Sequence, residues 1–469
     1  MNIHLGLLLV YSAGLISLGL WIGRRVESSG GFFVANRKLG AALIFSTVLA
    51  ANIGAGTTVG AASLGYRDGL AAWWWVGSAG LGTLVLAFWI GPRIWRAATD
   101  HGLYTMGDYL ELRYGRSVRG AITALLWLGA PTVLATQLIA MGKIIEFVAG
   151  APYWAGVLIG SVVMTVYFTA GGLLTSAWVN MVQLVVLVVG FAIAIPWALY
   201  AAGGWDAVLT ATATPADFST FLGNGGSGWI YLALVAPNFM VSPGLVQKVY
   251  GAVDEKAIRV GLGAVAIALM AFAIVPPLLG MIAHVYEPTL ADPDHALMVV
   301  LTSGLPTLLG ILALAAVFSA EISSADAALF MLATSLSQDL YKRFLRPDAS
   351  DAQVLKVARL AAVGGGVAGV ALALMLHSVI DTLTIFYALM AVSLFVPVVA
   401  GLYSRRPGAP EALAAGGVGV ATLITVTLMD VADPSPWFNA SFLGLVASAA
   451  AFGIVFLMRR TRAGETRES

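Results

Sequence analysis

Apolar runs of about 20 residues recur along the whole chain, separated by short charged or Gly/Pro/Asn-rich breaks. An α-helix needs a run of this length to cross a bilayer. The pattern predicts about thirteen membrane-spanning helices, near residues 2–23, 41–66, 71–96, 119–149, 152–174, 178–201, 228–250, 257–286, 306–340, 353–377, 381–403, 409–430 and 436–458. We therefore expect an all-α integral membrane protein without a soluble domain.

The second of these runs has a polar, glycine-bearing middle, ANIGAGTT, where a spanning helix is usually richest in Leu and Val. Gly54 and Gly56 weaken helix geometry, and Asn52, Thr57 and Thr58 bring polar groups to membrane depth. Hydrocarbon leaves freed backbone groups unsatisfied, so an interruption is tolerated where it lines a cavity or binds a ligand. We interpret this stretch as half of a binding site.

The seventh run is interrupted in the same way. Pro237, Asn238, Pro243 and Gly244 lie at membrane depth, and each proline removes a backbone donor. Because the second interruption comes five helices after the first, the spacing indicates an inverted repeat with its binding site at the two breaks. The alternative is that these residues only kink two ordinary membrane helices.

The ninth run carries a polar stripe. Ala320, Ser323 and Ser324 are spaced i, i+3 and i+4, so they share one helical face. Two hydroxyls beside carbonyls freed by a break form an uncharged oxygen cage, which suits a hard monovalent cation such as Na⁺. The alternative is that small residues here allow close helix packing. Glu321 and Asp326 on the same helix are ionisable groups at membrane depth, which mark ion or substrate paths, so we treat them as gating candidates.

Composition and charge agree with this class of protein. The chain of 469 residues is 59% hydrophobic and 10% charged, and its net charge of +1 gives no reason to expect nucleic acid. The absence of cysteine excludes disulfides, zinc thiolates and iron–sulfur clusters. With the N-terminus outside, nearly all Lys and Arg fall in cytoplasmic loops, Arg119 and Lys248 among them, and only Arg67 and Lys143 fall outside. We therefore expect a multi-pass protein of the cell (plasma or inner) membrane with its C-terminus in the cytoplasm.

Several stretches resemble the sodium:solute symporter family, which includes sodium/proline, sodium/galactose and pantothenate carriers. The resemblance covers essentially the whole chain, through FFVANRKLG, YTMGDYLELRYG, GGLLTSAWVNMVQ and LVQKVYGAVDEKA, and most specifically SAEISSADAALFMLATSLSQDLYKRF. It implies a leucine-transporter-like five-plus-five inverted repeat, with one extra helix before and two after. The repeats would be residues 41–205 and 206–405, flanked by 1–40 and 406–469.

The resemblance also implies a sodium site between the first and eighth core helices. By position, its ligands would be the backbone carbonyls of Ala50, Ile53 and Ala320 and the hydroxyls of Ser323 and Ser324. Three of these five residues form the face selected above from spacing alone.

Two positions depart from the family pattern. Val179-Asn180 stands where the family often has Thr-Asp, whose acid is thought to help cytoplasmic ion release. Glu321 stands where relatives have a small or apolar residue. We hypothesise that Glu321 replaces the lost charge and adds proton sensitivity.

The solute is expected to bind between the two breaks. The candidates there are neutral hydrogen-bonding groups and an aromatic wall: Asn52, Gly56, Thr57, Phe239, Met240 and Ser242, with Gln137 from core helix three. No fixed positive charge stands among them for a carboxylate. The sequence leaves a sugar, an amino acid, a monocarboxylate or a vitamin open, and we interpret Trp73, Trp74 and Trp75 as an interfacial belt.

The predicted function is sodium-coupled import of a small organic solute by alternating access. An enzyme is disfavoured, because the chain lacks HExxH and GxSxG and its five histidines are scattered. A sensor would need a cytoplasmic output domain, and a channel would lack a gated mid-membrane site. Proton-coupled or sodium-independent transport is the closest alternative. The partners expected are the solute and membrane lipid, with no nucleic acid and no obligatory protein partner.

Overall fold

The computed structural model describes residues 33–212, 218–222, 228–404, 406–429 and 439–468 and isolated positions before residue 33, without the side chains of 167, 169–178 and 462–468. The regular elements of this part of the chain are helices, and its only β-structure is one isolated bridge between Leu39 and Ala252. It contains 10 helices long and apolar enough to cross a membrane and two shorter apolar ones, residues 41–52 and 153–166. Apart from a few isolated positions, the span predicted at 2–23 lies outside the described residues.

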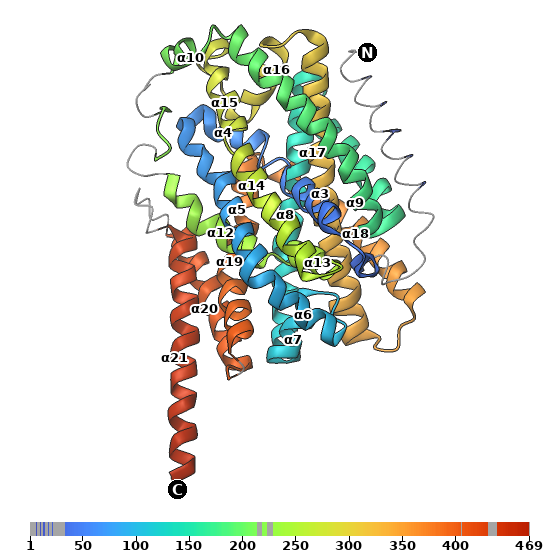
Figure 1. Ribbon diagram of the computed structural model, residues 1–469, viewed down its shortest axis with the longest axis vertical. Coiled ribbons are helices and arrows are strands. Elements are labelled where there is room, and N and C mark those ends of the chain that lie inside the picture. Colours follow the sequence, from blue (N-terminus) through green and yellow to red (C-terminus); the bar gives the residue numbers. More distant parts are fainter. Residues whose placement is uncertain are drawn as a thin grey trace.

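The first half of the chain forms the helices α3 (Ala41–Asn52), α4 (Val59–Asp68), α5 (Trp73–Val85), α6 (Gly91–His101), α7 (Met106–Tyr114), α8 (Arg116–Ala149), α9 (Tyr153–Ala201) and α10 (Trp205–Ala211). The second half forms α12 (Ile230–Val241), α13 (Pro243–Tyr250), α14 (Glu255–Phe272), α15 (Val275–Tyr286), α16 (Ala296–Ser303), α17 (Thr307–Thr334), α18 (Asp351–Met375), α19 (Val379–Tyr403), α20 (Ala409–Leu428) and α21 (Ala440–Glu468). In Figure 1, α10 and α16 lie at one end of the bundle, α6 and α7 lie at the other, and α21 projects beyond its neighbours.

Three predicted spans differ from the observed helices. The spans predicted at 152–174 and 178–201 form one continuous helix, α9, because no proline lies between them and adjacent glycines alone do not end a helix. The span predicted at 257–286 is divided into α14 and α15 just before Pro276 and Pro277.

Large apolar side chains cover much of the outer surface. Leu128 is 70% exposed, Val367 is 66% exposed and Ile267 is 65% exposed, all on long apolar helices. Water would disfavour so many exposed aliphatic groups, whereas the hydrocarbon of a bilayer accommodates them. The fold is therefore that of a multi-pass membrane protein.

The interior brings helices from distant parts of the sequence together. α17 packs against α3, α8 and α9, and α12 packs against α5 and α19. The two interrupted segments therefore lie near the middle of the bundle, where the polar groups described below are buried.

Candidate functional site

The first predicted interruption is confirmed. α3 ends at Asn52, α4 begins at Val59, and residues 53–58 between them are not helical. The hydroxyl of Thr57 accepts a hydrogen bond from the Gly54 amide at 2.9 Å and lies 3.0 Å from the Asn52 carbonyl. Thr57 thus satisfies backbone groups that the end of the helix leaves free.

The polar face of α17 lies against this interruption. The Ser323 hydroxyl lies 2.7 Å from the Ala50 carbonyl and 2.9 Å from the Ala320 carbonyl. The Ser324 hydroxyl lies 3.0 Å from the Ala51 carbonyl and 3.4 Å from that of Ala50. The contact with Ala320 lies within α17, and the other three join the end of α3 to the middle of α17. Ile53, the first residue after α3, is buried beside them.

A glycine is required at position 54, where α17 packs against the non-helical residues 53–58. A Cβ atom at Gly54 would lie 2.2 Å from the Ser324 hydroxyl oxygen and 2.6 Å from Oε1 of Gln137. Gln137 Oε1 in turn accepts a hydrogen bond from the Ala55 amide at 2.8 Å. The glycine therefore permits the close approach of α17, and α8 holds the non-helical segment through Gln137.

Glu321 contacts the other end of the interruption. Its carboxyl group is fully buried and accepts a hydrogen bond from the Thr58 hydroxyl at 2.9 Å. α17 thus binds both ends of the break, through the two serines at α3 and through Glu321 at α4. The other gating candidates, Asp326 on α17 and Asn180 on α9, are also buried.

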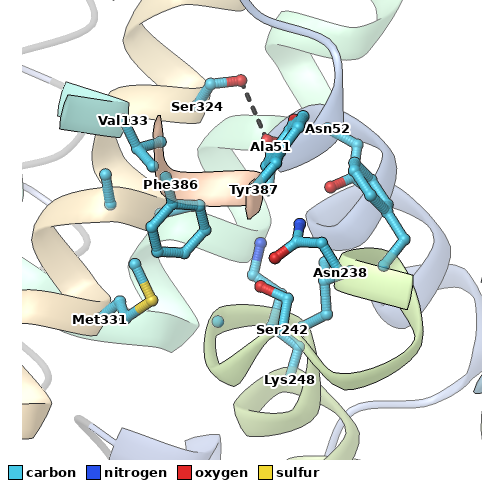
Figure 2. Close-up of a pocket in the computed structure, with 15 residues that line it drawn as sticks. Ala51, Asn52, Val133, Asn238, Ser242, Lys248, Ser324, Met331, Phe386 and Tyr387 are labelled. Carbon is cyan, nitrogen blue, oxygen red and sulfur yellow. Dashed lines mark hydrogen bonds between the residues drawn. The ribbon is translucent and has the colours of Figure 1, made fainter. Parts of the chain in front are cut away.

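The second predicted interruption is also confirmed. α12 ends at Val241, α13 begins at Pro243, and Ser242 between them has a non-helical backbone. Beside it lies a cavity of about 80 Å³. Figure 2 shows the cavity with Val133, Met331 and Phe386 on one side and Asn52 and Asn238 on the other. Ala51 and Ser324, which are joined by a hydrogen bond, line it as well.

The predicted solute contacts divide into two groups. Asn52, Phe239 and Ser242 line the cavity, whereas Gly56, Thr57, Gln137 and Met240 are not among its lining residues. The Gly56 carbonyl instead accepts a hydrogen bond from the Trp75 indole at 2.7 Å.

The interpretation of all three tryptophans as an interfacial belt is wrong for Trp75. Its side chain is 2% exposed, and its ring contacts Tyr231 and Tyr387 inside the bundle.

Lys248 is a cavity residue that the sequence interpretation missed. It was assigned to a cytoplasmic loop, but it is 2% exposed and its ammonium donates a hydrogen bond to the Thr47 carbonyl at 2.7 Å. The signal was present in the spacing, because a helix starting at Pro243 places Gly244 and Lys248 one turn apart on one face. Both residues line the cavity.

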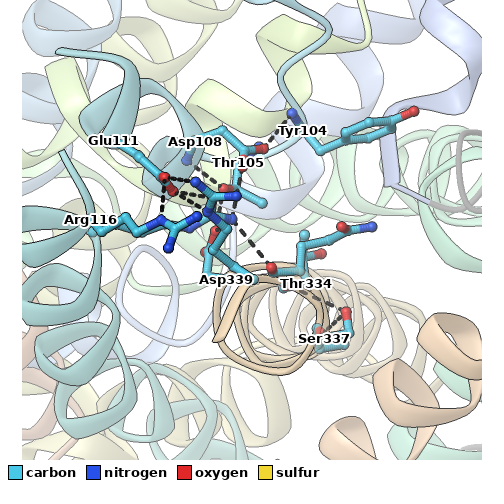
Figure 3. Close-up of polar contacts among 12 residues, drawn as sticks. Tyr104, Thr105, Asp108, Glu111, Arg116, Thr334, Ser337 and Asp339 are labelled. Carbon is cyan, nitrogen blue, oxygen red and sulfur yellow. Dashed lines mark hydrogen bonds and ion pairs between the residues drawn. The ribbon is translucent and has the colours of Figure 1, made fainter. Parts of the chain in front are cut away.

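Arg119 was likewise assigned to a loop and is instead buried in an ionic network. Figure 3 shows three acidic members of this network, Asp108, Glu111 and Asp339. The Arg119 guanidinium lies 2.7 Å from Asp339, 2.8 Å from Asp108 and 2.9 Å from Glu111. Burial raises the pKa of Glu111, but hydrogen bonds from Arg343 and Arg119 outweigh burial and hold this pKa below its usual value. The network joins α7, the start of α8 and residues 335–345, which continue α17.

Lys143 occupies a second ionic cluster, at the other end of α8. Its ammonium lies 2.6 Å from Asp292 and 2.9 Å from Asp294, and Asp294 also accepts a hydrogen bond from the Val379 amide at the start of α19. Burial raises the pKa of Asp292, but the hydrogen bond and the charge of Lys143, the Asp294 amide and the charge of His295 together outweigh burial and lower this pKa overall. The cluster connects α8 with the segment before α16, which carries Asp292 and Asp294, and with the start of α19.

Two interrupted membrane helices around a cavity lined by both polar and apolar side chains are typical of a secondary transporter. Comparison with known proteins agrees. The Sodium:solute symporter family matches residues 32–419. The chain is similar to the sodium/pantothenate symporter of Escherichia coli, with 27% identity over 86% of this chain and 87% of that one. It is also similar to the high-affinity proline transporter PutP of Bacillus subtilis, with 25% identity over 92% and 94%.

Two solved structures share the fold. A Na⁺-coupled sialic acid symporter in a substrate-bound outward-open state has a TM-score of 0.81 at 18% identity, covering 98% of both chains. Mhp1, a nucleobase-cation-symport-1 family transporter in a closed conformation, has a TM-score of 0.60 at 15% identity, covering 92% of this chain and 94% of that one. The chain belongs to the sodium:solute symporter family. The predicted function, sodium-coupled solute symport with Na⁺ as the coupling ion, is confirmed at this level.

Proposed function

We propose that Na⁺ binds between the end of α3 and the middle of α17. Its ligands are the carbonyls of Ala50, Ile53 and Ala320 and the hydroxyls of Ser323 and Ser324. The observation that carries the proposal is that both serine hydroxyls already lie at 2.7–3.0 Å from carbonyl oxygens of Ala50 and Ala51. The donor set consists of neutral oxygens, which a hard monovalent cation prefers. Each hydroxyl needs only to turn its lone pairs toward the ion.

We propose further that the small organic solute binds in the cavity between the two breaks. Ala51 and Ser324 line this cavity and also belong to the contacts around the proposed ion site. An ion that fixes α17 against α3 therefore changes the wall that the solute contacts. Binding of ion and solute is then reciprocally coupled, and both favour the state in which the cavity is complete. Release on the other side of the membrane completes alternating access.

The membrane arrangement is part of the same proposal. Two five-helix inverted repeats, residues 41–205 and 206–405, would place the broken segments at matching positions, with about thirteen spans in the whole chain. Arg96, Arg113 and Arg116 belong to α6, α7 and α8 at the end of the bundle where α6 and α7 lie (Figure 1). By the positive-inside rule this end faces the cytoplasm, which puts the N-terminus outside.

The experiment that tests the proposed function is a screen of solutes against the purified protein. Melting temperatures are measured with each solute in Na⁺ buffer and in choline buffer, and uptake into proteoliposomes follows for every solute that stabilises. We expect at least one solute to raise the melting temperature in Na⁺ buffer and to accumulate inside proteoliposomes when an inward Na⁺ gradient drives uptake. In choline buffer, the same solute should cause little stabilisation and little uptake. Equal binding and uptake in both buffers would contradict sodium coupling.

Proton involvement is a second candidate, supported by Glu321. Its carboxyl group is fully buried, and within the described part of the chain its Oε2 atom has no hydrogen-bond partner. A buried carboxyl group next to a binding site often exchanges a proton during transport. We therefore expect Glu321→Gln to weaken the dependence of uptake on pH and to change the apparent affinity for Na⁺. An unchanged pH profile together with unchanged Na⁺ affinity would show that Glu321 has only a structural role.

A further inference from the structure

Lys248 places a positive charge in the wall of the solute cavity. Its ammonium has three donors, and among the described residues its hydrogen-bond partner is the Thr47 carbonyl. Asp326 attracts it electrostatically, but none of the ion pairs found within 4.0 Å in the described part of the chain includes Lys248. Among the described residues, two of its donors therefore have no hydrogen-bond partner, and Lys248 lines the cavity.

A buried ammonium without an ion-pair partner is costly in a membrane protein, and such groups commonly mark the binding site of an ion or substrate. Lys248 lies at the second break, on the first helical turns after Pro243, and the cavity that it lines is the one shared with Ser324. An anionic group of a bound solute would add to the attraction of Asp326 and give this ammonium a direct ion-pair partner.

Two amide side chains that line the same cavity each have one buried polar atom without a hydrogen-bond partner among the described residues. Among the described residues, Nδ2 of Asn52 and Oδ1 of Asn238 are buried without a hydrogen bond. The Asn238 side chain is 2% exposed, and Figure 2 shows it beside the cavity near Ser242. A buried donor and a buried acceptor left unpaired each cost free energy, which a ligand that pairs with them recovers.

We propose that the solute is a small carboxylate. Its anionic group binds the ammonium of Lys248, and a hydroxyl or amino group on the same molecule donates a hydrogen bond to Oδ1 of Asn238. The remaining body of the solute packs against Val133, Met331 and Phe386. This inference rests on the proposed function of the cavity as the solute site. It replaces the expectation that no fixed positive charge faces the solute, and it excludes neutral sugars.

The test compares carboxylates with their neutral amides. The purified full-length protein is melted in Na⁺ and in choline buffer with unsubstituted, 2-hydroxy and 2-amino acids of three to six carbons, with the carboxamide of each, and with neutral sugars. We expect at least one carboxylate to stabilise the protein in Na⁺ and its amide to bind about 10- to 100-fold more weakly, as loss of a charge-assisted hydrogen bond predicts. This comparison uses the wild-type protein and so does not depend on how a variant folds.

Two variants and one control then assign the effect to Lys248. Lys248→Met should lose the preference for the carboxylate over the amide, and Lys248→Arg should retain part of it. Lys256→Met removes a lysine from an exposed position of α14 and should bind like the wild type. Stabilisation by neutral solutes alone, no stabilisation by any carboxylate, or an unchanged carboxylate preference in Lys248→Met would overturn the proposal.

The two proposals fail in different ways. A carboxylate that binds through Lys248 equally well in Na⁺ and choline supports this inference and contradicts sodium coupling at Ser323 and Ser324. A neutral sugar that binds only in Na⁺ supports the proposed function and contradicts the carboxylate.

Discussion

Replacing both Ser323 and Ser324 with alanine is expected to abolish sodium-dependent uptake at ordinary Na⁺ concentrations. The double substitution removes the two side-chain oxygens of the proposed ion site and leaves only backbone carbonyls. Each hydroxyl lost from a charged partner weakens binding by about 10- to 100-fold. The apparent Na⁺ affinity, measured from the Na⁺ dependence of uptake into proteoliposomes, should therefore fall beyond the measurable range in the double variant and by about 10- to 100-fold in either single one.

Ser393→Ala is the matched control. Ser393 is also a fully buried serine in a membrane helix, but its hydroxyl donates to the Leu389 carbonyl one turn earlier in its own helix. Its removal costs one local hydrogen bond and touches neither break. Ser393→Ala should keep the wild-type Na⁺ dependence. The sodium site is wrongly placed if Ser323→Ala and Ser324→Ala behave like Ser393→Ala.

The residues of the proposed ion site stand out in the sequence because their signals are local. A helix face follows from the i, i+3, i+4 spacing of Ala320, Ser323 and Ser324, and a break follows from glycine and polar residues within one apolar run. The family resemblance added Ala50 and Ile53 as partners. The structure then brings Ser323 and Ser324 to the end of α3, over a sequence separation of more than 270 residues.

The residues that were misplaced depend on tertiary packing. A lysine or arginine near the end of an apolar run looks like a loop residue, because a charge is costly inside a membrane unless another segment satisfies it. For Lys248 that segment is α3, and for Arg119 it is α7 together with the end of α17. A local sequence pattern cannot predict a hydrogen-bond or ion-pair partner that lies about 200 residues away in the sequence. Trp75 also depends on tertiary packing, although its partner is nearer in the sequence: its indole donates to the carbonyl freed at Gly56, 19 residues earlier.

α17 connects the proposed ion site with the ionic network near one end of the bundle. Ser323 and Ser324 lie in its middle, and its π-helical continuation, residues 335–345, carries Asp339. Asp339 accepts hydrogen bonds from Arg119 and from the hydroxyl of Thr105, which precedes α7, and Figure 3 shows Asp339 near Thr105. The network therefore fixes the position of the helix on which the ion site depends.

Arg119→Met is expected to destabilise the protein by about 3–5 kcal/mol, the usual cost of removing one partner from a buried ion pair. Methionine fills similar space, but the carboxyl groups of Asp339, Asp108 and Glu111 lose their shared cation, and Arg343 compensates only Glu111. Because the folded-state pKa of Glu111 is lowered, its pairing stabilises the protein above its unfolded-state pKa. This stabilisation is lost as the pH falls through the lowered value. The loss of stability in Arg119→Met should accordingly be largest near neutral pH and smaller in acid, as measured by unfolding in detergent.

Arg116→Met is the control that separates a buried charge from charge in general. Arg116 belongs to the same cluster and lies 3.6 Å from Glu111, but its side chain is 68% exposed. Surface pairs contribute at most about 1 kcal/mol, so Arg116→Met should unfold close to the wild type at every pH. Equal destabilisation by the two substitutions would mean that the ion pairs of Arg119 contribute no more to stability than an exposed surface pair. A large effect confined to Arg119→Met, accompanied by weaker Na⁺ dependence of uptake, would establish that the network holds α17 in the position that the ion site requires.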